Sequence, residues 1–201
     1  AYSLDGRFLL VPQNNLDTLQ GSVAVYEIVE DKPLLVSEIL LPGSGPHEIV
    51  RHPLRDEFYL ALGGLETHPD YGRTPFNLGS FQSQIVKLDL SGSVEALGQW
   101  PGSQGVSLRH LSFDKQERLY VGGQIKDKRR TSKKTSVAWV MDNQKIEALA
   151  ITHLLDGYSS SVSSAAEGAL ISSKQTGTVI QISGTNIVGQ TSVEGASAVA
   201  Y

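Results

Sequence analysis

His110-Leu111-Ser112-Phe113-Asp114-Lys115 is a short apolar strand that ends in a polar turn, and this unit recurs along the chain. Other copies lie at residues 1–7, 48–53 and around 162–168. The copies begin about 47 to 62 residues apart, close to the roughly 40 to 50 residues of a propeller blade. We therefore expect one supersecondary unit repeated about four times.

Each copy is followed by the same series of further strands and turns. The strand segments are short, rich in β-branched or aromatic residues and partly alternating, as in residues 58–62, 85–90 and 179–182. Turn-forming residues separate them, as at 90–93, 141–144 and 183–186. No stretch combines a 3.6-residue apolar period with helix caps. The sequence therefore predicts an all-β chain, a β-propeller of four-stranded antiparallel blades.

The blade boundaries follow from the repeat. We expect a single propeller region with blades at residues 1–43, 44–104, 105–155 and 156–195, and the start of a further blade at 196–201. Propellers have 4 to 8 blades. Either strands pair across the termini to close a small ring, or these blades belong to a larger ring. We favour the larger ring.

Composition excludes several classes of protein. With 40% hydrophobic and 19% charged residues and a net charge of -4, the 201-residue chain gives no reason to expect nucleic acid or an anionic membrane as partner. It has no cysteine, so disulfides and thiolate metal sites are impossible. No apolar run approaches the roughly 18 residues of a transmembrane helix. The chain begins at Ala1 without an initiator Met, so the absence of a signal peptide is uninformative.

Blade topology predicts where a site lies. The loops between blades share one face with the loops between the second and third strands of each blade, so polar residues in them should converge on one rim of the channel. The predicted rim residues are His47, Glu48, Thr67, His68, Asp70, Arg73, Asn77, Arg109, His110 and Gln124.

The chemistry of these residues leaves alternatives open. His47 and Glu48 follow a Gly-Pro turn, where they serve as metal ligand or general base, or only cap backbone groups. Arg73 and Arg109 suit bidentate binding of a carboxylate or phosphate, or salt bridges between blades. The loop around His68 is about 20 residues long, and such loops are usually functional or disordered.

A metal site is conceivable but has no compact motif. Its ligands would come from separate loops, namely from His47, His68, Asp70 and His110. No His-Glu-x-x-His spacing, phosphate-binding Gly-rich loop before a helix, or Gly-x-Ser-x-Gly elbow occurs. The cofactor therefore stays unknown at this point, with a metal ion as one possibility.

Three segments resemble a known family. Gly45-Pro46-His47-Glu48, residues 63–73 and residues 107–111 are similar to the bacterial proteins grouped as domain of unknown function 1513, and Asn77-Leu78 and residues 1–7 also fit. The resemblance implies a seven-bladed propeller exported to the periplasm, often encoded beside iron-uptake components. By this resemblance we expect N-terminal blades and the signal to be missing from this shorter chain, which has Leu65 and Leu108 where the family more often has Ile. No established catalytic residue carries over.

A looser resemblance is to the seven-bladed lactonases, whose blade start is similar to residues 45–53. The long loop that follows has no match there, and shared fold does not establish shared function.

Two functions follow as expectations. The first is a periplasmic binding or docking protein, linked to iron or metal acquisition, whose partner is a small molecule, a metal or a periplasmic protein. The alternative is a lactonase-like hydrolase in which His47 or Glu48 acts as base on water, while Arg73 or Arg109 holds an anionic substrate and stabilises the oxyanion. A purely structural scaffold is a third possibility.

Overall fold

The computed structural model describes most of the chain in eight ranges. These are residues 1–15, 20–43, 45–63, 83–97, 106–125, 135–151, 159–173 and 176–193. Within these ranges, only the backbone is described for residues 106, 107, 124, 125, 135–137, 159 and 160. The chain divides into two compact units, Ala1–Gly98 and Gln99–Tyr201, which are described separately.

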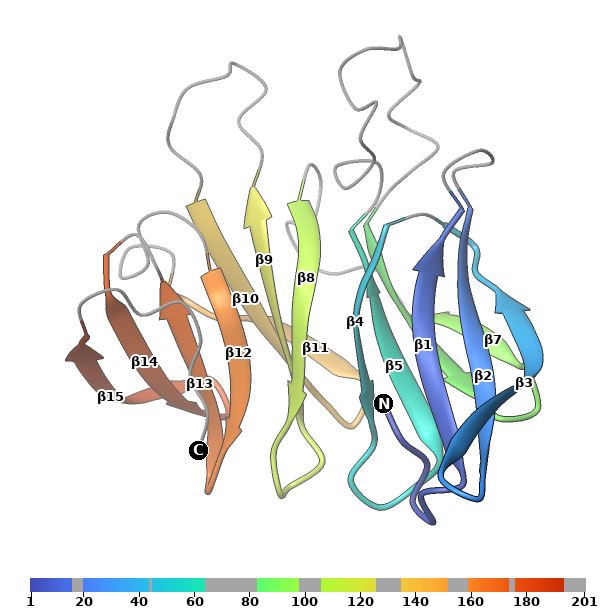
Figure 1. Cartoon of the computed structure of the whole chain (residues 1–201). Helices are drawn as coiled ribbons and strands as arrows, with labels where there is room; N and C mark the ends of the chain where they lie inside the picture. The colour runs from blue at the N-terminus through green and yellow to red at the C-terminus, as the bar shows by residue number, and fades with distance from the viewer. Residues whose placement is uncertain are drawn as a thin grey trace, which may run out of the picture. The chain divides into compact units, whose positions relative to one another are not determined.

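The first unit contains two antiparallel sheets, coloured blue to green in Figure 1. The first sheet consists of β1 (Phe8–Asn14), β2 (Gly21–Val29) and β3 (Lys32–Leu40). Tyr2 forms a β-bridge with Leu9, and Ala1 exchanges two backbone hydrogen bonds with Leu10, so residues 1–3 precede β1 as the end of a further strand. The second sheet consists of β4 (Pro46–Arg51), β5 (Glu57–Leu62), β6 (Gln84–Asp89) and β7 (Val94–Leu97).

The second unit repeats this plan with two four-stranded sheets. The third sheet consists of β8 (Val106–Phe113), β9 (Leu119–Ile125), β10 (Thr135–Asp142) and β11 (Lys145–Ala148). The fourth consists of β12 (Ser159–Ala165), β13 (Gly168–Ser173), β14 (Thr178–Ser183) and β15 (Asn186–Ser192). In every sheet, strands that are consecutive in sequence are neighbours and run antiparallel. The all-β prediction is confirmed, and the described ranges contain no helix that could span a bilayer.

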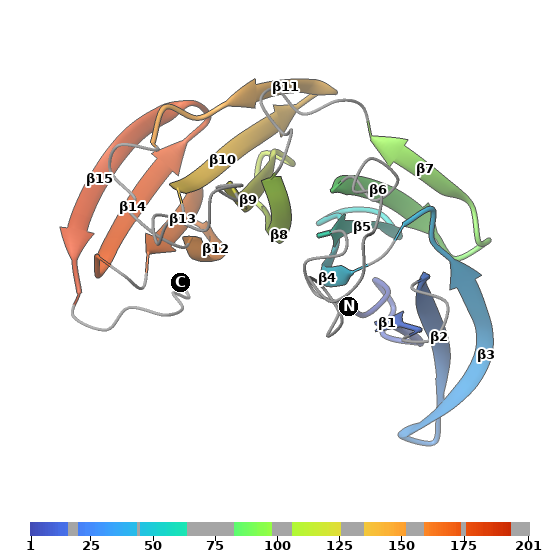
Figure 2. The same ribbon diagram turned by 90° about the horizontal axis from the view of Figure 1, so that it is seen from above.

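Each unit has a core between its two sheets. Alternate residues of a strand share a face of the sheet, so the apolar side chains on the facing sides of two sheets pack together. In the first unit the buried side chains come from both sheets and include Leu10, Val23, Val25, Phe58, Leu60 and Leu62. In the second unit they include Tyr120, Val140, Val162, Ile171, Ile180 and Ile182. Figure 2 shows the sheets of each unit from above, with β1 beside β4 and β8 beside β12.

A buried polar residue opens each of three turns, which join residues 1–3 to β1, β4 to β5 and β8 to β9. These residues are Ser3, His52 and Asp114, which are 4%, 1% and 2% exposed. Each donates its backbone N–H across the turn, and each side chain accepts a backbone N–H at 2.9, 3.2 and 3.0 Å respectively. These caps satisfy backbone donors that the turn removes from the ladder. The polar residue at the end of the repeated sequence unit is therefore explained by its role in capping the turn.

Candidate ligand site at the first-strand bulges

The first strand of the second sheet is irregular where two predicted site residues lie. In β4, Pro46 pairs with Leu62 and Ile49 pairs with Leu60, so His47 and Glu48 together face one residue of β5, Ala61. This is a β-bulge, which inserts one extra residue into one strand of an antiparallel pair. Because cross-strand partners share a face, His47 and Glu48 lie on the face of Ala61 rather than on the Leu60 face that packs against the first sheet.

The same irregularity recurs in the other unit. In β8, Leu108 pairs with Gly123 and His110 with Gly122, which leaves Arg109 as the extra residue. In β12, the register shifts between Ser159 and Ser161. The bulges lie at nearly the same place in the repeat, since residues 47 and 109 each precede the first residue of the turn by five positions and residue 160 precedes it by six.

Bulges bend a strand and change the direction of its side chains, and they are over-represented next to active sites. A bulge at nearly the same place in three consecutive sheets is therefore a feature of the repeat, not a local accident. The residues opposite are small, namely Ala61 in β5 and Gly122 in β9. Small partners leave room beside the bulged strand for the larger His, Glu and Arg side chains.

His47 and Glu48 are both partly buried at the start of β4. The Nε2 atom of His47 is buried. Imidazole and carboxylate are both suited to proton transfer or to metal coordination. The bulge therefore presents two groups of the kind that a base or a ligand requires.

Arg109 is the cationic residue of the β8 bulge. Burial lowers the pKa of its guanidinium, because desolvation disfavours the charged form. A guanidinium nevertheless stays protonated in proteins. An anion bound beside Arg109 would offset this desolvation and could be held by two parallel hydrogen bonds. His110, the next residue, is partly buried and pairs with Gly122 on the face turned to the fourth sheet.

The remaining predicted residues divide into two groups. Gln124 lies in β9, where its backbone position pairs with Ser107 and Ser136; its side chain is outside the description. Five residues fall outside the described ranges altogether, namely Thr67, His68, Asp70, Arg73 and Asn77. Since His47 and Glu48 belong to one unit and Arg109 and His110 to the other, their common rim stays a prediction.

Two of the four predicted metal ligands, His47 and His110, lie in the described ranges. Across the eight described ranges, no three His, Cys, Asp or Glu side chains lie close enough together to hold a metal ion. His68 and Asp70 are not among those residues. The four-residue metal site stays a prediction.

Sequence reasoning missed a buried network in the turn after β8, which it treated as an ordinary charged hairpin turn. Oδ1 of Asp114 accepts the backbone N–H groups of Gln116 at 2.9 Å and Arg118 at 3.0 Å. Oδ2 accepts from Nε of Arg118 at 2.7 Å and from the hydroxyl of Tyr120 at 3.1 Å. The carboxylate is completely buried, so these four bonds replace its hydration.

Tyr120 extends this network to the fourth sheet. Its hydroxyl accepts a hydrogen bond of 2.9 Å from the backbone N–H of Gly184, in the turn between β14 and β15. Burial is the main reason why the pKa of Tyr120 is raised to about 12. The signal available in the sequence was a tyrosine six residues after the aspartate that opens the turn.

The raised pKa of Tyr120 predicts a loss of stability in alkali. The stabilisation is fully present below the unfolded pKa of 10.0 and is lost as pH rises through the folded pKa of about 12. At about 1.4 kcal/mol per pKa unit, the free energy of unfolding should fall by roughly 2 to 3 kcal/mol across this interval. This fall in the free energy of unfolding is measured by urea unfolding of the wild type and of Tyr120→Phe at about pH 10 and about pH 12. The variant should lose most of this pH dependence, whereas Tyr2→Phe, at a site 56% exposed, should keep it; equal dependence in all three proteins would contradict the assignment.

The repeated four-stranded sheets with irregular first strands define the class of this chain as a β-propeller protein. Solved structures support the class. The chain is similar to the β-propeller domain of the Trilobed protease from Pyrococcus furiosus, with a TM-score of 0.54 and 12% identity over 94% of this chain and 56% of that one. It is also similar to a periplasmic gluconolactonase from Pseudomonas aeruginosa, with a TM-score of 0.53 and 16% identity over 97% of this chain and 53% of that one.

The chain belongs to the family described as Protein of unknown function (DUF1513), whose model matches residues 1–201. This confirms the resemblance stated from the sequence. No curated protein matches the chain. The chain spans a little over half the length of the solved structures compared above. At these low identities the structural similarity establishes the fold alone.

Proposed function

We propose that this chain is part of a β-propeller binding protein that holds a small anionic ligand at the bulged starts of its first strands. The observation that supports this function is the bulge at nearly the same place in β4, β8 and β12. Two of the three bulges carry ionisable side chains, His47 with Glu48 and Arg109 with His110. Partly buried charged groups require polar partners, and a bound anion would supply a further one.

The ligand carries a carboxylate or a phosphate in this proposal. Arg109 supplies the cation, because its planar guanidinium binds either group through two hydrogen bonds. His110 adds a donor on the neighbouring position, opposite Gly122. Arg73 stays part of the predicted rim together with Thr67, His68, Asp70 and Asn77.

The whole protein is proposed to be a seven-bladed ring located in the periplasm. The length of the similar structures supports additional blades, since this chain covers only 53% to 56% of them. One of these structures is a periplasmic protein. A link to iron or another metal would require His47, His68, Asp70 and His110 to act together, and a chelator in the binding experiment tests it.

Binding of inorganic phosphate and of D-gluconate to the full chain tests the proposed function. Calorimetry at low ionic strength should detect at least one of them, and Arg109→Ala should weaken it about tenfold or more, since a hydrogen bond to a charged group contributes about 1.5 to 3 kcal/mol. Arg109→Lys should retain part of the affinity. Arg7→Ala, which removes an exposed arginine paired with Glu27, is the matched control and should bind as wild type.

Two results of this experiment would oppose the proposal. If neither anion binds, or if Arg109→Ala binds as tightly as Arg7→Ala, the β8 bulge is not an anion site. Repeating the titration with a chelator separates direct binding from binding through a metal. If the anion binds equally tightly in the presence of the chelator, the result supports the Arg109 guanidinium as the binding group.

A lactonase-like hydrolase is the second candidate. The observation that favours it is the pairing of His47 and Glu48 opposite Ala61, which puts an imidazole and a carboxylate on one face of β4. Such a pair can activate water as general base, and in this proposal Arg73 or Arg109 stabilises the developing oxyanion. One similar structure is a gluconolactonase. Hydrolysis of glucono-δ-lactone that is lost in His47→Ala, with the fold retained, would favour this class over simple binding.

A further inference from the structure

The second unit has a cavity that the proposed function does not use. It has a volume of about 370 Å³ and lies between the third and fourth sheets. Its lining residues come from the turn ends of β9, β10, β11, β14 and β15, and are Arg118, Val140, Asp142, Lys145, Glu147, Ser183, Gly184, Thr185 and Asn186. The bulges lie at the starts of β8 and β12, whereas this cavity lies at the strand ends near the turn that follows β8. The two places are therefore distinct.

Arg118 is held in a single position at the wall of this cavity. Its Nε donates to Oδ2 of Asp114 at 2.7 Å, and its Nη2 donates to the side chain of Gln116 at 3.3 Å. The guanidinium lies 6.0 Å from the centre of the Tyr120 ring, within the range of a cation–π contact. Asp114 and Tyr120 are buried, so this position is set before any ligand arrives.

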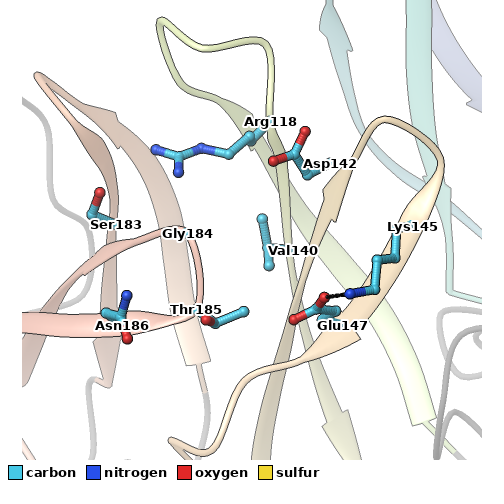
Figure 3. Close-up of a pocket in the computed structure, with 9 residues that line it drawn as sticks. All are labelled: Arg118, Val140, Asp142, Lys145, Glu147, Ser183, Gly184, Thr185 and Asn186. Atoms are coloured by element: carbon cyan, nitrogen blue, oxygen red, sulfur yellow. Dashed lines mark ion pairs between the residues drawn. The ribbon is translucent and has the colours of Figure 1, made fainter.

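The Nη1 group of Arg118 faces the turn between β14 and β15. A Cβ at Gly184 would lie only 3.1 Å from Nη1, which shows how closely the guanidinium approaches that turn. Figure 3 shows the Arg118 side chain directed across the cavity toward Ser183 and Gly184. The arginine thus offers a fixed donor to whatever lies between the two sheets.

The rest of the lining is polar and offers both donors and acceptors. Lys145 and Glu147 form an ion pair on β11 (Figure 3). Asp142 accepts a hydrogen bond of 2.9 Å from the side chain of Asn143 and is otherwise exposed. Ser183, Thr185 and Asn186 add two hydroxyls and an amide on the opposite wall. Val140 is the one apolar side chain among the lining residues.

The charges of this lining decide which kind of ligand fits. The two cations, Arg118 and Lys145, are matched by Asp142 and Glu147, and the buried Asp114 adds one more negative charge behind Arg118. An anion gains no net attraction here, and an apolar molecule would find a single apolar contact. A neutral molecule rich in hydroxyls matches the lining, because each hydroxyl both donates and accepts. A cavity of this volume is at the lower end of the range for small-molecule sites, roughly 300 to 1,000 Å³.

We propose that this cavity binds a neutral, polyhydroxylated small molecule of the size of a monosaccharide. Nη1 of Arg118 donates to one hydroxyl, the carboxylates of Asp142 and Glu147 accept from others, and Asn186 contacts the ligand from the fourth sheet. The site is independent of the anion site at the first-strand bulges. Either can fail without the other.

D-glucose is the probe that tests this site. Titration of the full chain, followed by backbone amide NMR shifts, should move the amides of residues 183–186 and 145–147 together, with a dissociation constant on the order of 1 to 10 mM. Asp142→Asn and Asn186→Ala should each weaken binding several-fold. Both positions are exposed, so neither change should disturb the fold, and an otherwise unchanged spectrum verifies this. Lys32→Ala, an exposed change in β3 of the first unit, should bind as wild type.

Three results would overturn the proposal. The first is the absence of shifts at residues 183–186 in the presence of D-glucose. The second is a set of shifts that persists unchanged in both Asp142→Asn and Asn186→Ala. The third is a stronger response of the same amides to inorganic phosphate, because it would make the cavity an anion site.

Discussion

Gly168→Ala is expected to lower the free energy of unfolding by about 3 to 5 kcal/mol, the sum of backbone strain and overpacking. Gly168 is the first residue of β13, directly after the turn that follows β12, with φ at +137°, a conformation that essentially only glycine adopts. A Cβ there would lie 1.8 Å from the carbonyl oxygen of Ile182. That oxygen belongs to β14, where Ile182 pairs with Ala169, so it cannot move without disturbing the ladder.

Gly6→Ala is the matched control for this change. Gly6 also has positive φ, at +74°, but an added Cβ would meet nothing within 4 Å. The control therefore carries the backbone strain of about 1 kcal/mol without the collision. Urea unfolding followed by circular dichroism compares the two. A midpoint for Gly168→Ala close to that of Gly6→Ala would show that β13 and β14 can separate at little cost, contrary to our account.

Asp114→Ala is expected to destabilise the protein by about 3 to 5 kcal/mol, as when one partner of a buried ion pair is removed. The change removes four acceptor contacts at once and leaves the Arg118 guanidinium, which is 17% exposed, without its carboxylate. It also removes the acceptor for the buried hydroxyl of Tyr120, which connects the third sheet to Gly184 of the fourth. Unfolding of the wild type and the variant in urea at neutral pH measures the loss.

Asp89→Ala is the control for turn capping alone. Asp89 accepts hydrogen bonds from the backbone N–H and hydroxyl of Ser91 and from the backbone N–H of Ser93 in the turn before β7, but these bonds are exposed to solvent. Water can replace them, so the loss should be much smaller than for Asp114→Ala. Equal losses in the two variants would mean that burial and the link through Tyr120 contribute nothing.

The fold could be predicted because its signals are local. Residues 58–62, 85–90 and 179–182 were expected as strands from their β-branched and aromatic content, and the structure has β5, β6 and β14 there. The turn at 141–144 was expected from Asp142 and Asn143 and joins β10 to β11. Repetition of this local pattern was enough to indicate four-stranded blades, since each sheet connects consecutive strands.

The irregularities of the site could not be predicted in the same way. A bulge depends on which residue of the next strand lies opposite, so neither Gly45-Pro46-His47-Glu48 nor Arg109 shows it in the sequence alone. The cavity near Arg118 depends on the approach of two sheets whose residues are about 65 positions apart. Both features arise from pairing between segments, whereas composition and turn chemistry report on single segments.

The most direct test of the proposed binding site is a phosphate titration of the wild-type chain, followed amide by amide by NMR. Our account predicts that shifts concentrate at the β8 bulge, at residues 108–111, because Arg109 lies there. Shifts confined to the turn ends around residues 142–147 and 183–186, or spread evenly over exposed lysines and arginines, would contradict an anion site at the starts of the first strands.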